Sequence, residues 1–571
     1  MTAATIEKLH PIVKALLKER GLIDAADITK FLEPSYEEHL NDPFLMPDMQ
    51  KAVDRILLAM ERKERIAVYA DFDCDGIPGA AILKSLFDRI EYDNIEIYIP
   101  NRSFDGYGLH TEAIDTLKER GVKLVITVDL GITAVEAVSY AQKLGMDVIV
   151  TDHHELPEEL PSAFALINPK FAPYPDPYLC GAGTAFKLVQ ALLIEGKKRS
   201  LSNFTRVPSG WEKWLLDLVA IATIADMVPL TGENRVLARF GLLVLRKTPR
   251  PGIVALMRVL GNDQSELTEE DIGFTIGPRI NAASKMDETE IALRLLTTKS
   301  AREAEMLAVQ IEALNKRRKG IAASITREVN KRVKERELAN EKVLVLGDPE
   351  WKSVMLGPVA NSVVKDNGGI VCLWGKDSSG KIKGSCRSAG SLSVVELFDA
   401  SREVLEQAGG HHFSGGFTVG AEQVHRLPEV FRTNGETLVE KEKELSGSVY
   451  EARLLDCSQS LHDALAVCAP FGMGNEKPLF VFRGVEIDSV RSFGKAKEHL
   501  EVSLRDGETH MKAIQFFAGP TSFEMVPEAG KRATVLAFFE RSVYRGRVEL
   551  RLRLVDIYSQ EKETHATIWS I

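Results

Sequence analysis

The sequence has 571 residues and a formal net charge of −10 at pH 7. At roughly 100 to 200 residues per domain, this length predicts three or four domains. The apolar fraction of 44% and the charged fraction of 27% are ordinary for a soluble globular protein. The apolar runs are too short to span a bilayer, and the N-terminus lacks a basic segment followed by an apolar core. We therefore expect a cytoplasmic protein without a membrane segment.

Composition also limits the kind of metal site and partner. The six cysteines are scattered without a CysXXCys pair, which argues against a zinc knuckle or a disulfide framework. A bound metal is therefore expected to be held by oxygen and nitrogen. The acidic balance disfavours nucleic-acid binding, which needs positive potential, but a cleft can be positive in an acidic protein.

Strands alternate with helices from residue 66 onward. Pro78 is expected to open the first helix, where its missing N–H costs nothing. This alternation predicts right-handed βαβ units and a largely parallel sheet. The predicted strands are 66–70, 95–99, 123–128 and 148–151, and the predicted helices are 78–90, 111–120, 134–144 and 211–225.

A long charged helix is predicted over residues 300–338. It lacks proline, and because no full face of it is apolar, we expect it to bridge two domains. Its basic groups at 316–319 and 331–336 are compatible with nucleic-acid contact, but a solvated helix face is the favoured interpretation.

A second α/β unit is predicted from residue 342, with strands at 343–346 and 370–374. It is expected to end near Thr418, before a charged helix over 428–445. Short alternating stretches then favour a five-stranded oligonucleotide-binding barrel. Those stretches are 479–482, 500–504, 533–539 and 548–555. The predicted organisation is an N-terminal helical segment (1–50), an α/β domain (51–299), the connecting helix (300–341), a second α/β domain (342–446) and the barrel (447–571).

Acidic side chains follow the first predicted strand. Asp71, Asp73 and Asp75 alternate, so in an extended segment they point to one side, and Gly76 then lets the chain enter the helix. Three such carboxylates repel one another unless a cation neutralises them. An acidic loop at a helix N-terminus is the plainer alternative.

More metal-binding residue types follow the neighbouring elements. Asp129 follows the 123–128 strand, the segment TDHH at 151–154 follows the next strand, and Asp226 follows an apolar helix. Carboxylates and imidazoles gathered at one sheet edge suit Mn²⁺ or Mg²⁺ better than thiolate-preferring metals. Two such ions bind a phosphoryl oxygen, activate water and stabilise the leaving oxygen. The pattern therefore predicts a metal-dependent phosphoesterase.

The motifs together resemble those of a known family. DFDCDG (71–76), VDLGI (128–132), TDHH (151–154), TIADMVPL (223–230) and GPRINAA (277–283) resemble, in order and spacing, the motifs of the DHH phosphoesterases. Further matching motifs are YIPNR (98–102), DGYGL (105–109), CGAGTAFK (180–187), SCRS (385–388), GGH (409–411) and PFGMGN (470–475). With them, the resemblance covers nearly the whole chain. It is strongest to the bacterial DHH exonucleases that degrade single-stranded DNA from the 5′ end.

The resemblance implies a site with two Mn²⁺ or Mg²⁺ ions. It implies that Asp129 bridges both ions and that Asp71 and Asp152 orient the ligands. His154 would face the scissile phosphate and stabilise developing charge, so that the implied catalytic residues are His154, Asp129 and Asp152. The implied metal ligands are Asp73, Asp75, Asp129, His153 and Asp226.

The resemblance also implies contacts to the strand. Arg guanidinium groups match phosphate bidentately, whereas each such residue alone is more often a surface ion-pair partner. The implied nucleic-acid-binding residues are Arg102, Arg279, Asn281, Ser385, Arg387 and His411.

The chain departs from the family pattern at four places. A Trp-His pair followed by a glycine is replaced by Trp351-Lys-Ser-Val, and a Ser-Arg pair by Ala360-Asn-Ser. The GGH segment continues as HFSGG, and a Gly-Arg ending is replaced by Ser284 and Lys285. The metal ligands are retained, so the departures concern the strand-binding surface.

The resemblance implies a monomeric exonuclease that releases 5′-mononucleotides in DNA repair and recombination. Its implied partners are single-stranded DNA, a single-strand-binding protein and a helicase. An oligoribonucleotide or cyclic-dinucleotide phosphodiesterase is the first alternative, although such relatives commonly lack the barrel. A non-catalytic strand-binding scaffold is disfavoured by the retained ligands, and an inorganic pyrophosphatase by the length and by Tyr69, where that group has a histidine.

Overall fold

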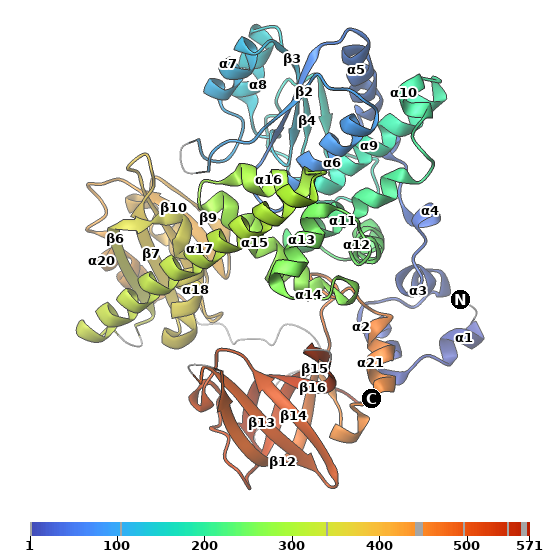
Figure 1. The fold of residues 1–571 in the computed structure, drawn as a ribbon. Coiled ribbons are helices and arrows are strands. Elements are labelled where there is room, and N and C mark those ends of the chain that lie inside the picture. The colour runs from blue at the N-terminus through green and yellow to red at the C-terminus, as the bar shows by residue number, and fades with distance from the viewer. Residues whose placement is uncertain are drawn as a thin grey trace. The chain divides into compact units, whose positions relative to one another are not determined.

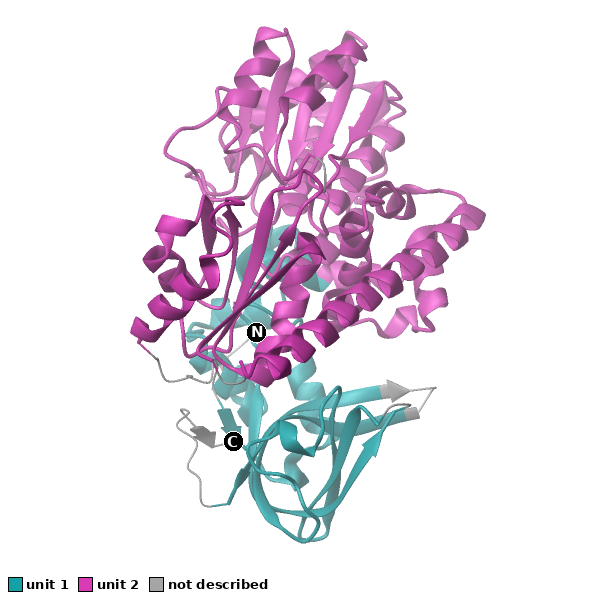
Figure 2. Ribbon diagram, turned by 90° about the vertical axis from the view of Figure 1, so that its left-hand side faces the viewer, with its two compact units in different colours: residues 1–40, 229–239, 444–571 teal, residues 41–228, 240–443 magenta. Residues whose placement is uncertain are grey.

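The computed structural model describes residues 3–102, 105–338, 341–439, 449–494, 497–544, 547–560 and 568–570. The chain divides into two compact units (Figure 2). Unit 1 consists of Met1–Leu40, Pro229–Arg239 and Glu444–Ile571, and unit 2 of Asn41–Val228 and Phe240–Lys443. Among the described residues, no helix combines the length and apolar character needed to cross a membrane.

Unit 2 begins with the predicted parallel sheet, in the order β2-β1-β3-β4-β5. Helices α7 and α8 cover one face, and α5, α6 and α9 cover the other (Figure 1). The strands are β1 (Arg65–Ala70), β2 (Ile95–Tyr98), β3 (Val122–Val128), β4 (Asp147–Thr151) and the unpredicted β5 (Ala165–Ile167). The helices are α5 (Met49–Glu61), α6 (Gly76–Arg89), α7 (Thr111–Glu119), α8 (Val135–Lys143), α9 (Gly181–Lys198) and α10 (Ser202–Thr205), with a 3-10 turn η1 (Pro43–Leu45).

Helix α6 begins two residues earlier than predicted, at Gly76 instead of Pro78. A Cβ at Gly76 would lie 2.4 Å from the backbone oxygen of Asp71, so the tight turn requires glycine there. The predicted 211–225 helix is a 3-10 turn, η2 (Trp211–Leu215), followed by α11 (Leu216–Ala225).

A helical layer follows α11. It contains α12 (Gly232–Leu245), α13 (Pro251–Leu260), η3 (Gln264–Glu266), α14 (Glu269–Asp271), the π-helical turn η4 (Ile272–Ile276), α15 (Gly277–Lys285) and α16 (Thr289–Thr297). The long helix α17 (Ala301–Glu335) comes next. It connects the two α/β domains as predicted, and one stripe of it, which includes Leu307, Ile311 and Val329, is buried along α13, α15 and α16.

The second α/β domain of unit 2 contains a mixed sheet in the order β6-β7-β8-β10-β9, in which only β6 and β7 are parallel. Helices α17 and α18 cover one face, and α19 and α20 the other. The strands are β6 (Val343–Lys352), β7 (Ile370–Lys376), β8 (Ile382–Ser388), β9 (Gln407–His411) and β10 (Ser414–Val419). The helices are η5 (Ser353–Met355), α18 (Leu356–Asn367), α19 (Val394–Ala400), η6 (Arg402–Val404) and α20 (Leu427–Thr437).

Two expectations for this domain need correction. Phe431 of α20 is buried with Val343 of β6, so the packed domain continues past Thr418, and α20 ends at Thr437 instead of residue 445. Cys372 and Cys386 lie opposite each other on β7 and β8 and form a disulfide, a pairing that their sequence spacing did not suggest.

Unit 1 contains a closed five-stranded barrel. Strands β13, β14, β16, β15 and β12 are neighbours in that order, and pairing of β12 with β13 closes the barrel. Strand β14 was not predicted. The strands are β12 (Leu479–Phe493), β13 (His499–Asp506), β14 (Thr509–Gln515), β15 (Arg532–Tyr544) and β16 (Arg547–Ser559), and β11 (Val449–Glu451) and β17 (Ile568–Ser570) extend the sheet beyond β12.

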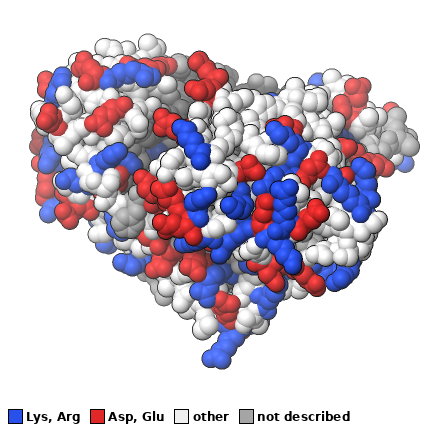
Figure 3. Space-filling model, turned by 90° about the horizontal axis from the view of Figure 1, so that it is seen from above, with Lys and Arg blue, Asp and Glu red and all other residues white. Residues whose placement is uncertain are grey.

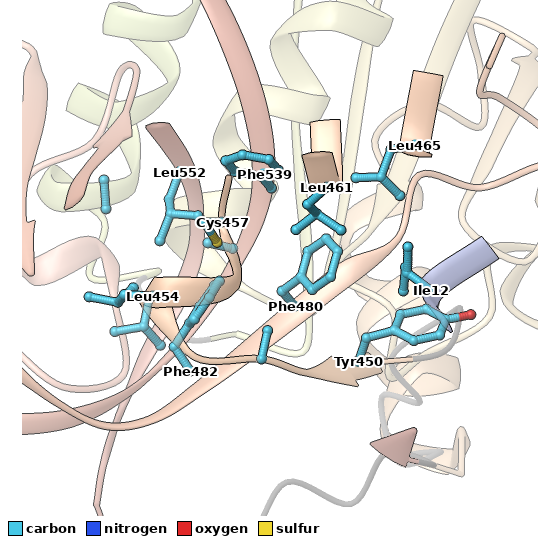
Figure 4. Close-up of a cluster of buried hydrophobic side chains, with 14 of the residues drawn as sticks. Ile12, Tyr450, Leu454, Cys457, Leu461, Leu465, Phe480, Phe482, Phe539 and Leu552 are labelled. Atoms are coloured by element: carbon cyan, nitrogen blue, oxygen red, sulfur yellow. The ribbon is translucent and has the colours of Figure 1, made fainter. Parts of the chain in front are cut away.

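Short helices pack against the barrel. Phe480 of β12 is buried in one cluster with Ile12 of α2, Tyr450 of β11 and Leu461 of α21 (Figure 4). The N-terminal segment up to Leu40 is therefore part of the barrel unit, and the domain boundaries proposed from the sequence stay predictions. The short helices of unit 1 are α1 (Ala3–Glu7), α2 (Pro11–Glu19), α3 (Ala25–Leu32), α4 (Tyr36–His39), η7 (Leu454–Asp456), α21 (Gln459–Ala466) and η8 (Pro520–Ser522).

Candidate metal centre and nucleic-acid cleft

Acidic and histidine side chains converge at the carboxyl ends of β1, β3 and β4, and Asp226 joins them from the end of α11. They form three groups in which one ligand atom per residue lies within 4.8 Å of the others. Asp129 occurs in two groups. Its place between two ions stays a prediction. The groups are Asp71, Asp73 and Asp129; Asp75, His153 and Asp226; and Asp129, His153 and His154.

The segment after β1 turns instead of staying extended. The Asp73 carboxylate oxygen Oδ1 accepts hydrogen bonds from the backbone N–H groups of Asp75 (2.8 Å) and Gly76 (3.2 Å). The expectation that Asp71, Asp73 and Asp75 share one side was therefore wrong. Asp71 and Asp73 belong to one group and Asp75 to another.

The N-terminus of α9 fixes the position of Asp75. Its two carboxylate oxygens accept hydrogen bonds from the backbone N–H groups of Gly181 (2.6 Å) and Ala182 (2.7 Å). A Cβ at Gly181 would lie 2.5 Å from the Cβ of Asp129. Glycine at this position lets α9 approach both carboxylates closely.

Without a cation, the buried carboxylates repel one another when they are ionised. Burial and the nearby carboxylates raise the pKa of Asp71 to about 7 and that of Asp226 to about 8. They also raise the pKa of Asp75 and of Asp129. A bound cation would stabilise the ionised forms, which is the opposite of what burial and like charge do.

The donor atoms fit a hard divalent cation. Asp71 Oδ1 is buried and has no hydrogen-bond partner among the described residues. Burial lowers the pKa of His153, which favours the neutral imidazole that binds metal, and its Nε2 lies 3.1 Å from Asp129 Oδ1. Burial raises the pKa of the nearby Cys74 and Cys180 thiols, so thiolate ligation is disfavoured. Oxygen and imidazole donors suit Mn²⁺ or Mg²⁺.

Asp152 organises the histidine pair. Its Oδ1 accepts hydrogen bonds from the backbone N–H groups of His153 (2.7 Å) and His154 (3.2 Å), and Oδ2 accepts one from Ile132 (2.9 Å). Burial alone would raise the pKa of Asp152, but these bonds and His154 hold it below its ordinary value. The predicted orienting role of Asp152 stays a prediction.

His154 is the half-exposed member of the centre. Burial lowers the pKa of His154, but the Asp152 carboxylate, 2.7 Å from Nδ1, raises it. The net effect is a pKa above the ordinary histidine value. The Tyr107 hydroxyl lies 3.3 Å from Nδ1 and donates to the backbone oxygen of Asp129. The sequence motif DGYGL contained Tyr107, but no role for its side chain was predicted.

A cavity of about 900 Å³ lies within unit 2, lined by both of its α/β domains. Three of the predicted nucleic-acid-binding residues line it together: Arg102, Ser385 and Arg387. A Cβ at Gly357 would lie 2.9 Å from Arg387 Nη2, so this glycine leaves room for the guanidinium. Tyr107, Lys285 and Lys352 also line the cavity and were not predicted as site residues.

Three of the predicted nucleic-acid-binding residues do not line this cavity. Arg279 forms an ion pair with Glu312 (2.8 Å) and donates to the backbone oxygen of Thr275 (2.7 Å). Asn281 accepts a hydrogen bond from the backbone N–H of Cys74 (3.0 Å), which supports the acidic turn. His411 is exposed at the end of β9. Their strand contacts stay predictions.

Positive charge is local on this acidic protein. On the face drawn in Figure 3, Lys and Arg side chains gather towards the middle among scattered acidic residues. The cavity has more basic than acidic lining residues. The acidic ones are Asp105, Asp287, Glu350 and Asp377, and the basic ones are Arg102, Lys285, Lys352, Lys376, Lys381, Lys383 and Arg387. Such a lining gives the local potential that phosphate binding needs.

Comparison with known proteins agrees with the fold and the centre. Residues 65–223 match the N-terminal domain of the DHH family, residues 340–434 the DHHA1 domain, and residues 450–556 the RecJ OB domain. The fold and the acidic and histidine centre define a metal-dependent phosphoesterase of the DHH class.

Relatives narrow this class. The chain is 33% identical to the single-stranded-DNA-specific exonuclease RecJ of Bacillus subtilis, over 96% of this chain and 68% of the relative. It is 30% identical to RecJ of Haemophilus influenzae, over 96% of both chains. The chain belongs to the RecJ family of single-stranded-DNA-specific exonucleases.

Solved structures support the same assignment. The structure of RecJ from Thermus thermophilus in complex with Mn²⁺ matches with a TM-score of 0.79 and 25% identity, over 97% of this chain and 77% of that chain. A structure of exonuclease RecJ bound to manganese matches with a TM-score of 0.58 and 29% identity, over 70% of this chain and 97% of that chain.

Proposed function

We propose that this protein is a metal-dependent exonuclease that degrades single-stranded DNA from the 5′ end to 5′-mononucleotides in DNA repair and recombination. The observation that carries the proposal is the gathering of carboxylates and imidazoles around Asp129, within the same unit as a cavity lined by basic residues. A monomeric state, a cytoplasmic location and cooperation with a single-strand-binding protein and a helicase belong to the same proposal.

The five predicted ligands would hold two cations. Asp75, His153 and Asp226 would bind one, Asp73 would bind the other, and Asp129 would contact both. Asp71, predicted only to orient ligands, lies close enough to Asp73 and Asp129 to be a further ligand. When bound, the ions would supply charge stabilisation at phosphorus and lower the pKa of a water molecule.

The remaining residues of the centre would act on the scissile phosphate. The raised pKa of His154 favours the protonated ring, which would stabilise developing negative charge. Asp152 fixes the orientation of this ring through Nδ1, and the Tyr107 hydroxyl contacts it from the exposed side.

The cavity supports the 5′ polarity. Ser385 and Arg387 of β8 would bind the terminal 5′ phosphate beside the N-terminus of α18, where Gly357 lines the cavity. Arg102 lies over the ring of Phe72, 4.6 Å from its centroid, at the acidic turn itself. A terminal phosphate held there would place a nearby phosphodiester at the metal centre.

The barrel would also bind the DNA strand. Phe516 and Phe517 are 37% and 84% exposed, and both contact the His499 ring. Phe517 has a positive φ of 54°, and its backbone N–H donates to His499 Nδ1 at 3.1 Å. A strained backbone that presents an exposed aromatic ring suits base stacking, which is worth roughly 1 to 3 kcal/mol per base.

Strands labelled at either end test the proposal. Incubation with Mn²⁺ or Mg²⁺ should release labelled mononucleotide at once from the 5′ end, while label at the 3′ end stays in long products. First release from the 3′ end would contradict the polarity. Cleavage of cyclic dinucleotides or very short oligonucleotides, with long strands left intact, would favour the alternative phosphodiesterase.

A further inference from the structure

The cavity has a wall that the proposed mechanism does not use. Lys352 at the end of β6, Lys376 at the end of β7, and Lys381 and Lys383 at the start of β8 line it together with Ser385 and Arg387. All four lysines are exposed. We call them the lysine wall.

Strand geometry places Lys383 in line with the terminal-phosphate residues. Lys383, Ser385 and Arg387 alternate along β8 and so share one face. At about 3.3 Å per residue, Lys383 lies roughly 7 Å beyond Ser385 along the strand. Lys352 and Lys376 are direct partners in the β6–β7 pairing. On β8, Lys376 pairs instead with Ile382, whose side chain is buried on the other face of the sheet, so Lys352 and Lys376 line the cavity from the ends of their strands.

The lysine wall contains four lysines, and two carboxylates that line the cavity beside them, Glu350 and Asp377, compensate only part of this charge. The Asp377 carboxylate accepts hydrogen bonds from the backbone N–H groups of Ser379 (2.9 Å) and Lys381 (3.0 Å), and it pairs with Lys383 Nζ at 2.9 Å. Within the described part of the chain, no carboxylate pairs with the side chains of Lys352, Lys376 or Lys381. Like charges directly opposite each other on neighbouring strands are destabilising, so an anion between them would relieve repulsion.

We propose that the lysine wall binds the two outer phosphates of a 5′-triphosphorylated single strand, which makes such strands substrates. This proposal rests on the proposed function, because Ser385 and Arg387 must hold the innermost phosphate. The cavity, at about 900 Å³, is near the upper end of the roughly 300 to 1,000 Å³ typical of ligand pockets. It therefore has room for a terminal nucleotide with more than one phosphate.

The reaction needs no additional reactant. Water forms a new bond to the phosphorus that follows the terminal nucleotide, the bond from this phosphorus to the 3′ oxygen breaks, and the 3′ oxygen takes up a proton. The phosphoanhydride bonds stay intact. The first product is a nucleoside 5′-triphosphate, and the remaining strand carries a 5′ monophosphate.

Matched strands with a 5′ hydroxyl, monophosphate or triphosphate test this proposal with Mn²⁺. The unaltered protein should cut the monophosphate and triphosphate strands at similar rates and release a nucleoside triphosphate first. The triple variant Lys352→Gln, Lys376→Gln, Lys383→Gln should lose about tenfold more activity on the triphosphate strand than on the monophosphate strand. Lys331→Gln, on an exposed part of α17, is the control. A resistant triphosphate strand, or equal losses on both strands, would overturn the proposal.

Binding tests the proposal without hydrolysis. Fluorescence anisotropy without added metal should show tighter binding of the triphosphate strand than of the monophosphate strand, and the triple variant should lose this preference. Equal affinities in the unaltered protein would overturn the proposal even if no strand were cut. Failure to cut the monophosphate strand, with this preference intact, would instead contradict the proposed function. The same measurements on matched DNA strands and RNA strands show which of the two nucleic acids supplies the triphosphorylated end.

Discussion

Asp152 Oδ1 lies 2.7 Å from His154 Nδ1, and the same oxygen accepts the backbone N–H groups of both adjacent histidines. Asp152→Asn keeps the shape of this side chain but removes its charge. Because loss of an orienting partner at a metal site typically lowers activity roughly 10- to 100-fold, we expect turnover to fall by this factor with little change in strand affinity. Steady-state hydrolysis and strand binding measure the two effects.

Tyr107→Phe is the matched control for this substitution. It removes the hydroxyl 3.3 Å from His154 but leaves the Asp152 carboxylate in place, so a smaller loss of turnover is expected. Full turnover by Asp152→Asn would contradict the orienting role.

Gly181→Ala should disturb the centre although glycine carries no ligand. The new Cβ would lie 2.5 Å from the Cβ of Asp129, so α9 or the carboxylate must shift. Overpacking of this kind typically costs about 1 to 3 kcal/mol of unfolding free energy, and hydrolysis should fall with it. Thermal unfolding and hydrolysis should both be measured.

Gly183→Ala, two residues further along α9, is the control. Its Cβ would meet nothing nearer than 3.6 Å, so both properties should be preserved. Identical behaviour of the two variants would show that close packing at Gly181 is unimportant.

Lys285 should make strand binding sensitive to pH. Burial, assisted by Arg102, Arg318 and Arg387, lowers its pKa to about 8. Because only the protonated amine attracts phosphate, affinity should decline as pH rises through about 8. In Lys285→Arg the guanidinium stays charged, and this decline should disappear.

The lowered pKa of Lys285 also makes the unfolding free energy depend on pH. Between pH 8 and the ordinary lysine value of 10.5, the unfolded chain binds more protons than the folded chain at this position. The contribution of Lys285 to unfolding free energy should therefore increase with pH over this window. Denaturant titrations of the original protein and of Lys285→Arg at several pH values, without DNA, measure this contribution. A contribution of Lys285 that decreases with pH would contradict the shift.

Phe517→Ala should weaken the binding of long strands. Removal of one stacking platform corresponds to roughly 1 to 3 kcal/mol, or about 5- to 150-fold in affinity. Strands too short to reach the barrel should bind equally well. Leu455→Ala removes another exposed apolar side chain of unit 1 and is the control. Unchanged affinity for long strands would exclude Phe517 as a platform.

Divalent metal should stabilise the folded protein. The carboxylates of Asp71, Asp75, Asp129 and Asp226 all have raised pKa values because of burial and mutual repulsion. A cation that binds only the folded state raises the unfolding temperature with its concentration. Calorimetry in Mn²⁺ and in chelator should show this rise, and Asp75→Asn should reduce it. The same unfolding temperature in both solutions would argue against a metal at this centre.

The sequence predicted the strands that carry the centre because each is a short apolar run followed by a polar residue. Strands β1, β3 and β4 lie where they were predicted, to within one residue at each end. The three-residue β5 was missed because it is too short for a periodic pattern. The start of α6 was missed because it depends on the close approach of Gly76 to the Asp71 backbone, a contact that only the fold creates.

Side-chain partners were harder to predict than positions. Alternation placed Asp71, Asp73 and Asp75 on one side, but hydrogen bonds to Asp73 turn the backbone and separate them. Sequence spacing likewise gave no sign that Glu312 of α17 pairs with Arg279, since 33 residues separate them. The lysine wall was missed because its members come from three strands that only the sheet brings together.

The most direct test of a metal-dependent nuclease at this centre is Asp129→Ala, because Asp129 belongs to two of the three ligand groups. Hydrolysis of 5′-labelled single-stranded DNA and binding of the same strand should be measured together in Mn²⁺. We predict that hydrolysis is abolished while binding stays measurable, since the cavity lining and the barrel are unchanged. Metal-dependent hydrolysis that persists in the variant would contradict the assignment of this centre.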